Sequence, residues 1–364
     1  MLKKMDKKNI YICCGLILIP IVLILFLVLI RGCNGSISYE KYEDKMEKAA
    51  QKYFKDKDKL PKTEGGEVTV SLDDLVDTNY IKSTEKLLDD DSCTGSVTVR
   101  NNGASLEDNN GGFYLYIPSL SCDSYKTIHL IDKLMEDVVT SKSGLYQVDD
   151  GYVYKGAKVN NYVSFFDKTY RIISIDNNGI LKLVKVDPEK NSVVWDGKYN
   201  TEKKQMSGKN DYSDSKIIDV LIENYNKFKD NQKKHIMAYS VCYGNRSLEY
   251  TTIDKTSECS KILDNQFLSL MNTYDYAMAS YDIECTKIDS CSCRNYNYIY
   301  NSIDVSWLMN GNADNSYEVY YYEDGHVDVN KANSTKRYNL VIHIDGNELY
   351  NKGDGSEENP YVIN

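Results

Sequence analysis

The apolar positions of the chain form one long uninterrupted run and many short periodic segments. The long run covers residues 10–30 and contains no charged side chain. At about 1.5 Å per residue, a helix of this length matches the roughly 30 Å hydrocarbon core of a bilayer, so the run predicts a single transmembrane helix. Residues 1–9 carry four lysines and one acidic residue. The positive-inside rule therefore predicts a cytoplasmic N-terminus, an extracellular C-terminus and a single-pass protein of the cell membrane.

The fate of this N-terminal segment has three alternatives. The sequence Ile30-Arg31-Gly32-Cys33 resembles a bacterial lipoprotein signal, in which the cysteine becomes lipidated. The other two are an uncleaved signal anchor and ordinary signal cleavage, and the length of the apolar run favours the anchor. All three place the bulk of the chain outside the membrane.

Residues 36–143 alternate helical and strand-like patterns. Apolar residues at three-and-four spacing predict an amphipathic helix from Tyr39 to Phe54. Alternation over residues 68–72 predicts a strand, and Ser71 with Asp74 resembles a capping box that opens a short helix. Further strands are expected at 96–100 and 113–117, and a second amphipathic helix at 128–139.

Residues 144–364 have the texture of short strands separated by turn signals. The turn Asn177-Asn178-Gly179 between residues 169–176 and 180–186 predicts a hairpin, because Asn-Gly readily adopts the positive φ angles of a tight turn. Further strands are expected at 152–154, 161–166, 317–322, 326–329 and 339–344, and helices at 215–228 and 268–279. About 330 residues follow the apolar run, enough for two domains of roughly 100–200 residues each. The expected fold is therefore α+β, with a transmembrane helix at 10–30 and domains at 36–143 and 144–364.

The first of these domains resembles bacterial type IV pilin-like and pseudopilin-like proteins. The resemblance covers residues 10–127 and rests on the apolar run, the turn Leu60-Pro61, the segment VTVSLDDLVDTNYI, and a small strand set closed by Cys93 and Cys122. The leader-processing motif of that family, a glycine followed shortly by a glutamate, does not occur before or within the apolar run. The resemblance implies a small pilin-like α+β domain or stalk.

The second domain resembles surface-protein modules of bacteria with a C-type-lectin-like fold, which is related to the formylglycine-generating enzyme. The order of the segments YVSFFDKTYRIISID, SWLMNG and RYNLVIHID and the closing GDGSEENPYVI carry this resemblance. It implies a larger α+β domain in which a long irregular insertion binds the ligand. Residues 245–261 and 285–314 are the candidates for that insertion.

Composition narrows the class of partner. The formal charge is −10 and the sequence pI about 5.1, which excludes a basic nucleic-acid footprint. The 32 tyrosines, against 7 phenylalanines and 2 tryptophans, suit half-exposed sheets and ligand contact. The base composition of an AT-rich genome is the alternative reason for the tyrosines.

In an exported chain the cysteines beyond the apolar run are expected to form disulfides. Proximity along the chain suggests Cys93 with Cys122, Cys242 with Cys259, and Cys285 with Cys291 or Cys293. Cys33 and one of the last three are left over unless they join each other, so Cys33 is the candidate for lipidation. Cys291-Ser292-Cys293 as a metal or redox element is the alternative.

Few residues stand out as ligand or metal contacts. The candidates for ligand contact are Trp307, Asn310, Asn312 and Asp314. The last three, together with Asn315, also offer oxygen ligands to a hard cation. A polar turn and, for Trp307, a place in the core are the alternatives. His326 with Asp328 and His343 with Asp345 form two H-x-D pairs, which suggest a metal site or, more simply, strand composition.

These patterns predict a non-enzymatic cell-surface protein. None of the motifs G-x-S-x-G, H-E-x-x-H or a glycine-rich phosphate loop occurs in the sequence, and no cofactor is expected. The expected partners are the membrane, through a single span, and a glycan or protein ligand bound by an adhesion-type domain, with no nucleic acid. The alternatives are a structural subunit of a pilus-like or secretion assembly, and a thiol or metal enzyme built on Cys291 and Cys293.

Overall fold

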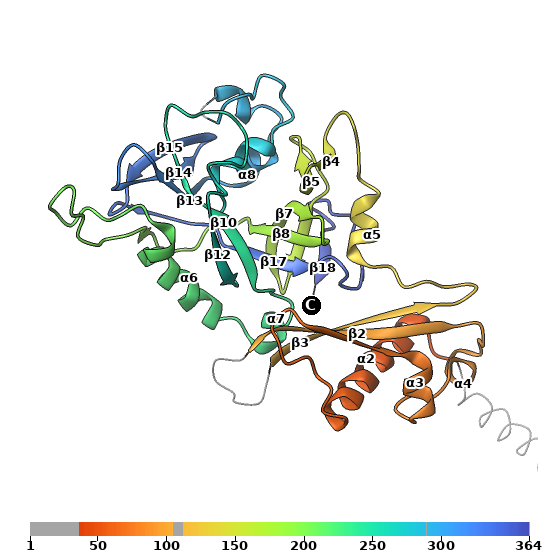
Figure 1. The fold of residues 1–364 in the computed structure, drawn as a ribbon. Coiled ribbons are helices and arrows are strands. Elements are labelled where there is room, and N and C mark those ends of the chain that lie inside the picture. The colour runs from red at the N-terminus through yellow and green to blue at the C-terminus, as the bar shows by residue number, and fades with distance from the viewer. Residues whose placement is uncertain (1–35, 105–111, 289, 364) are drawn as a thin grey trace, which may run out of the picture. The chain divides into compact units, whose positions relative to one another are not determined.

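The computed structural model describes residues 36–104, 112–288 and 290–363 (Figure 1). The chain divides into two compact units, each made of several segments. Of the described residues, the first unit comprises 36–58, 70–97 and 118–126, and the second comprises 59–69, 98–104, 112–117, 127–288 and 290–363. The predicted transmembrane segment at 10–30 and Cys33 lie outside the described residues.

The first unit is built on helix α2 (Tyr39–Asp56), which confirms the helix expected from Tyr39. The Ser38 side chain caps its start by accepting a hydrogen bond from the Lys41 backbone N–H. One face of α2 is buried, at the three-and-four spacing that the sequence predicted: Tyr42, Met46, Ala49, Ala50 and Phe54.

Two short helices pack beside α2, namely α3 (Leu72–Asp77) and α4 (Thr84–Leu88). The Ser71 side chain accepts a hydrogen bond from the Asp74 N–H, so the predicted cap of α3 is present. The Tyr42 hydroxyl donates to the Lys82 carbonyl oxygen at 2.9 Å, which ties the segment before α4 to α2.

Three strands pair in the order β1-β2-β3: β1 (Glu67–Ser71), β2 (Thr94–Ala104) and β3 (Gly112–Ser121). They cover the strands expected at 96–100 and 113–117 and residues 68–71 of the strand expected at 68–72, whose last residue, Leu72, begins α3. The Cys93–Cys122 disulfide joins the residue before β2 to the residue after β3. It therefore fixes one end of this antiparallel ribbon.

A seven-stranded sheet forms the core of the second unit. Its strands are β4 (Gly144–Val148), β5 (Gly151–Lys155), β6 (Tyr162–Phe165), β7 (Lys168–Asp176), β8 (Ile180–Lys185), β17 (Val341–Asp345) and β18 (Tyr361–Ile363). The order is β17-β8-β7-β5-β4, and β6 pairs with β7 and, in parallel, with β18 (Figure 1). Many apolar side chains of these strands are fully buried, among them Ile172, Leu181, Leu183, Ile342 and Ile344.

The β7–β8 hairpin confirms the predicted turn. Gly179 has φ +78°, a conformation that a side chain makes unfavourable, and its N–H donates to the Asp176 carbonyl oxygen at 3.0 Å. The Asp176 carboxylate also accepts the N–H groups of Asn178 and Ile180. A short polar turn with one glycine thus sets the register of the two central strands.

The remaining elements of the second unit surround this sheet. Its smaller sheets contain β9 (Val193–Val194) with β16 (Thr335–Lys336), β10 (Tyr239–Tyr243) with β12 (Lys261–Gln266), and β11 (Asn245–Arg246), β13 (Val305–Asn312), β14 (Glu318–Glu323) and β15 (His326–Lys331) in one four-stranded sheet. Its helices are α5 (Leu130–Met135), α6 (Lys216–Asn226), α7 (Asp230–Lys233), α8 (Thr273–Met278) and α9 (Tyr298–Ser302), with 3-10 turns η1 (Tyr212–Asp214) and η2 (Cys291–Arg294).

The predicted α+β fold class is wrong. Strands make up 35% of the structure and helices 21%, so the fold is mostly β. Within the described part of the chain, no helix combines the length and the hydropathy that crossing a membrane requires. The expected domains at 36–143 and 144–364 stay predictions.

Two overestimated helices explain part of the error. The helix expected at 128–139 is only α5, and the one expected at 268–279 is only α8. The residues before α8 are extended: the Ser269 N–H donates to the Val341 carbonyl oxygen and the Val341 N–H to that of Ser269. A short buried apolar run is compatible with both a helix and an extended segment. Here the backbone hydrogen bonds with β17 stabilise the extended segment.

Candidate functional site

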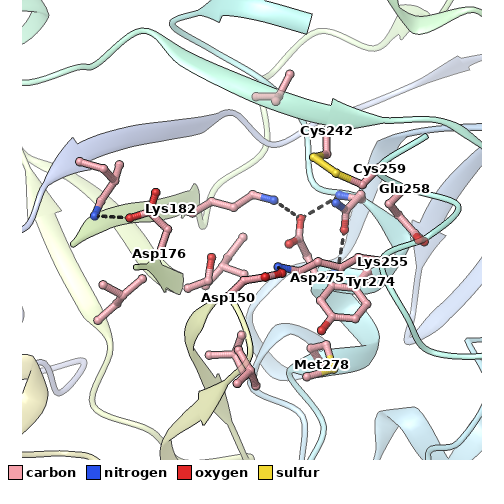
Figure 2. Close-up of a pocket in the computed structure, with 18 of the residues that line it drawn as sticks. Asp150, Asp176, Lys182, Cys242, Lys255, Glu258, Cys259, Tyr274, Asp275 and Met278 are labelled. Atoms are coloured by element: carbon pink, nitrogen blue, oxygen red, sulfur yellow. Dashed lines mark hydrogen bonds and ion pairs between the residues drawn. A yellow bond between two sulfur atoms is a disulfide. The ribbon is translucent and has the colours of Figure 1, made fainter. Parts of the chain in front are cut away.

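A cavity of about 270 Å³ lies inside the second unit, where the large sheet meets the elements that cover it. Strands β5, β7, β8 and β17 supply one wall, and β10, helix α8 and the loop at 255–259 supply the other (Figure 2). This loop belongs to residues 245–261, one of the two segments expected to form the irregular insertion. The lining combines apolar residues of the sheet with charged and aromatic residues.

An ion pair crosses the cavity. Lys182 Nζ on β8 lies 2.6 Å from Asp275 Oδ2 on α8, and the two side chains are 16% and 7% exposed. Asp275 is held in place by the start of α8: its carboxylate accepts the Asn272 N–H, while the Asn272 side chain accepts the Asp275 N–H. This reciprocal cap fixes the carboxylate to which Lys182 binds.

His343 lies next to Lys182 in the wall of the cavity. It is the register partner of Lys182 between β17 and β8, and its ring stacks on Tyr239 with centroids 4.1 Å apart. Burial, followed by the positive charge of Lys182, holds the pKa of His343 well below its usual range, so the imidazole is neutral near pH 7. His343 is 3% exposed, and its Nδ1 has no hydrogen-bond partner among the described residues.

Asp176 supplies a second carboxylate to the cavity. Its Oδ1 accepts the two N–H groups of the hairpin turn, and its Oδ2 accepts the Tyr239 hydroxyl at 2.9 Å. Burial, followed by the Asp176 charge, raises the pKa of Tyr239, so the phenol keeps its proton. Within the described chain, Asp176 forms no ion pair with a Lys, Arg or His side chain.

A more exposed ion pair stands at the rim. Lys255 Nζ lies 2.6 Å from Asp150 Oδ2, and the two side chains are 43% and 63% exposed. The same ammonium lies 5.5 Å from the ring centroid of Tyr274, within the range of a cation–π contact. Burial, followed by the charge of Asp275, raises the pKa of Tyr274 to about 12.

A buried ion pair holds the loop that covers the cavity. Arg246 and Glu258 are each 1% exposed and share two hydrogen bonds of 2.9 and 2.7 Å. The guanidinium also donates to the carbonyl oxygens of Tyr250, Thr252 and Asp254. The Cys242–Cys259 disulfide joins the end of the loop to β10, and both cysteines line the cavity.

The residues predicted for ligand contact lie elsewhere. Trp307 is fully buried and its indole N–H donates to the Val193 carbonyl oxygen, so the ring takes the core position that was its alternative. Asn310 and Asn312 are also buried in β13 and make hydrogen bonds within the protein. Asp314 is exposed and accepts hydrogen bonds from Ser247 and from the Leu248 N–H. The structure therefore does not bring these four residues together as an open ligand surface.

The prediction of disulfides is confirmed. The pairs are Cys93–Cys122, Cys242–Cys259 and Cys285–Cys293, and Cys291 is free and exposed. The thiol-enzyme alternative required free thiols at both Cys291 and Cys293, whereas Cys293 is bonded to Cys285.

The two H-x-D pairs do not meet. His326 is exposed on β15, whereas Asp345, beside His343 in sequence, forms an ion pair with Arg100. Of the described residues, one group of three potential metal ligands lies close together, Asp90 with Cys93 and Cys122. The disulfide between these cysteines withdraws their sulfur atoms from metal binding.

Sequence reasoning singled out His343 but missed Lys182, Asp275 and Asp176. The Asn272-x-x-Asp275 spacing was a usable signal for the helix start that positions Asp275. No local signal joins Lys182 to Asp275, because 93 positions separate them and only the folded sheet brings them together.

No protein-family model, curated protein or solved structure matches this chain. The site is therefore judged on its own geometry, and the pilin-like and lectin-like resemblances stay predictions.

Proposed function

We propose that this chain is a non-enzymatic binding protein exposed outside the cell, and that the cavity beside His343 holds a small polar ligand. The observation that carries the proposal is His343, a residue of the cavity wall whose Nδ1 is buried without a hydrogen-bond partner among the described residues. Such an unsatisfied atom costs about 1–3 kcal/mol. A ligand that forms a hydrogen bond with it removes this penalty.

The charged groups around the cavity support binding rather than catalysis. Lys182, Lys255 and Glu258 each form an ion pair, with Asp275, Asp150 and Arg246 respectively. The charged partner favours the charged form of each of these groups, so none of them is poised to exchange a proton with a ligand near pH 7. The same pairs give a ligand an ordered set of donors and acceptors.

The size of the cavity limits the ligand. At about 270 Å³ it lies just below the roughly 300–1,000 Å³ typical of sites for drug-sized ligands. A single sugar ring or a molecule of similar size fits this volume better than an extended chain. The three disulfides support a location outside the reducing cytoplasm.

The test is a thermal-shift screen of the full chain against monosaccharides, amino acids, amines and nucleosides. Ser240 belongs to the cavity lining and is exposed, so Ser240→Trp places a large ring beside the cavity without entering the core. Ser213→Trp, at an exposed serine outside the lining, is the matched control. We expect at least one compound to stabilise the wild type and Ser213→Trp but not Ser240→Trp. No stabilisation by any compound, or equal stabilisation of all three proteins, contradicts the proposal.

A further inference from the structure

The charges that line the cavity do not balance. Four carboxylates line it, against two ammonium groups and one neutral imidazole: Asp150, Asp176, Glu258 and Asp275 against Lys182 and Lys255, with His343. Arg246, behind the wall, compensates Glu258. One negative charge remains after these pairs are formed.

Asp176 carries the remaining charge. Its partners are a phenol hydroxyl and two backbone N–H groups, all of them neutral. Figure 2 shows the Lys182 side chain extending away from Asp176 and toward Asp275. The ammonium of Lys182 is thus committed to a different carboxylate, and Asp176 has no cationic partner among the described residues.

Two further features beside Asp176 suit a cation that carries N–H groups. The neutral His343 has one free ring nitrogen, which accepts a hydrogen bond in the tautomer protonated at Nε2. Tyr239 connects the two groups, because its hydroxyl donates to Asp176 while its ring stacks on His343. The rings of Tyr152, Tyr239 and Tyr274 in the lining add the aromatic surface that favours cations.

We infer that the cavity selects small ligands that carry a protonated primary amine, with the ammonium bound at Asp176 and Nδ1 of His343. This inference rests on the proposed function, since it names the ligand class of the same cavity. An amino sugar and a small alkylamine share this chemistry. An anion is opposed by the unpaired carboxylate, and a neutral polyol leaves that carboxylate without a cation.

The test compares three ligands that have one ring and different charge: glucosamine, glucose and glucuronate. Calorimetric titration of the full chain at pH 6.5 is expected to show that glucosamine binds at least about tenfold more tightly than glucose. The reason is that the ammonium of glucosamine adds one charge-assisted hydrogen bond to the carboxylate. Glucuronate is expected to bind most weakly. n-Butylamine is titrated in parallel to distinguish an amino sugar from an alkylamine as the ligand. Tighter binding of glucosamine indicates an amino sugar, and tighter binding of n-butylamine indicates an alkylamine.

The variant Asp176→Asn removes the charge but keeps an oxygen for the turn N–H groups. It is expected to reduce the preference for glucosamine over glucose about tenfold, whereas Asp328→Asn, at an exposed position on β15, leaves the preference unchanged. If Asp176→Asn does not fold, Tyr239→Phe frees one acceptor site on Asp176 and is expected to raise the preference. A preference that does not rise in Tyr239→Phe counts against the inference.

The outcomes separate this inference from the proposed function. Equal or tighter binding of glucose or glucuronate overturns the selection for amines while the cavity remains a binding site. Failure of all four compounds to bind overturns the inference, and failure of the whole thermal-shift screen overturns the proposed function as well.

Discussion

His343 on β17 is the register partner of Lys182 on β8, so an imidazole and an ammonium lie side by side on the same face of the sheet. Lys182 then reaches Asp275 at 2.6 Å, which leaves the imidazole next to a fixed positive charge in a buried site. Both effects favour the neutral ring. The pairing of β17 with β8 therefore places the charge that keeps His343 neutral.

The first prediction concerns the pH dependence of stability. Because the pKa of His343 is lowered in the folded state, the unfolded chain binds the extra proton below about pH 6.5. The stability that the neutral His343 contributes to the folded chain is therefore fully present above about pH 6.5. As the pH falls below this value, the free energy of unfolding decreases by up to about 1.4 kcal/mol per pH unit. Urea unfolding between pH 5 and 7.5 should show a steeper loss for the wild type than for His343→Gln. His326→Gln, at an exposed histidine, should behave as the wild type, and parallel curves for wild type and His343→Gln contradict this account.

The second prediction concerns the ion pair across the cavity. Lys182→Met leaves Asp275 nearly buried without its cation and should lower the free energy of unfolding by about 3 kcal/mol. The double variant Lys182→Met/Asp275→Asn should lose less than the sum of the single variants, because both members of the pair are removed together. Lys198→Met, in the exposed pair with Asp214, is the control and should cost less than about 1 kcal/mol. Additive losses in the double variant argue that the two residues do not interact.

The third prediction concerns the loop that covers the cavity. Arg246→Lys replaces a guanidinium that makes five hydrogen bonds with an ammonium that has three donors, and it should destabilise the chain by about 2–4 kcal/mol. Hydrogen exchange should accelerate over residues 246–258 more than over α6. Unchanged exchange in this loop is incompatible with the role assigned to Arg246.

The fourth prediction concerns the cysteines. Alkylation of the folded chain without reductant should label Cys291 and none of the six cysteines in the three disulfides. Replacing Cys242 and Cys259 together by alanine should cost about 3 kcal/mol and weaken ligand binding, because that disulfide closes a loop in the cavity wall. The pair Cys285–Cys293, outside the lining, provides the control, and its removal should leave binding unchanged. Equal loss of binding in both variants argues for general destabilisation.

Local patterns in the sequence predicted the local structure well. Helix α2 and the β7–β8 hairpin follow from spacing and turn chemistry among neighbouring residues, and the Cys242–Cys259 pairing follows from proximity along the chain. The error at 268–279 arose where a local pattern is ambiguous. There, backbone hydrogen bonds between Ser269 and Val341, residues far apart in sequence, override the helical spacing.

The candidate site was mostly hidden from sequence reasoning for the same reason. Its decisive relationships, Lys182 with Asp275 and Asp176 with Tyr239, join residues 93 and 63 positions apart. Trp307 and Asn310 were candidates for ligand contact, with a core position and a polar turn as their alternatives, and both are buried in β13. Burial depends on how the sheets pack, which no single stretch of the sequence reports.

The most direct test of the central claim is a crystal structure of the full chain soaked with glucosamine. We expect density for the sugar inside the cavity, with its ammonium within hydrogen-bond distance of Asp176 and of Nδ1 of His343. An empty cavity, or glucosamine bound only outside it, would contradict the account.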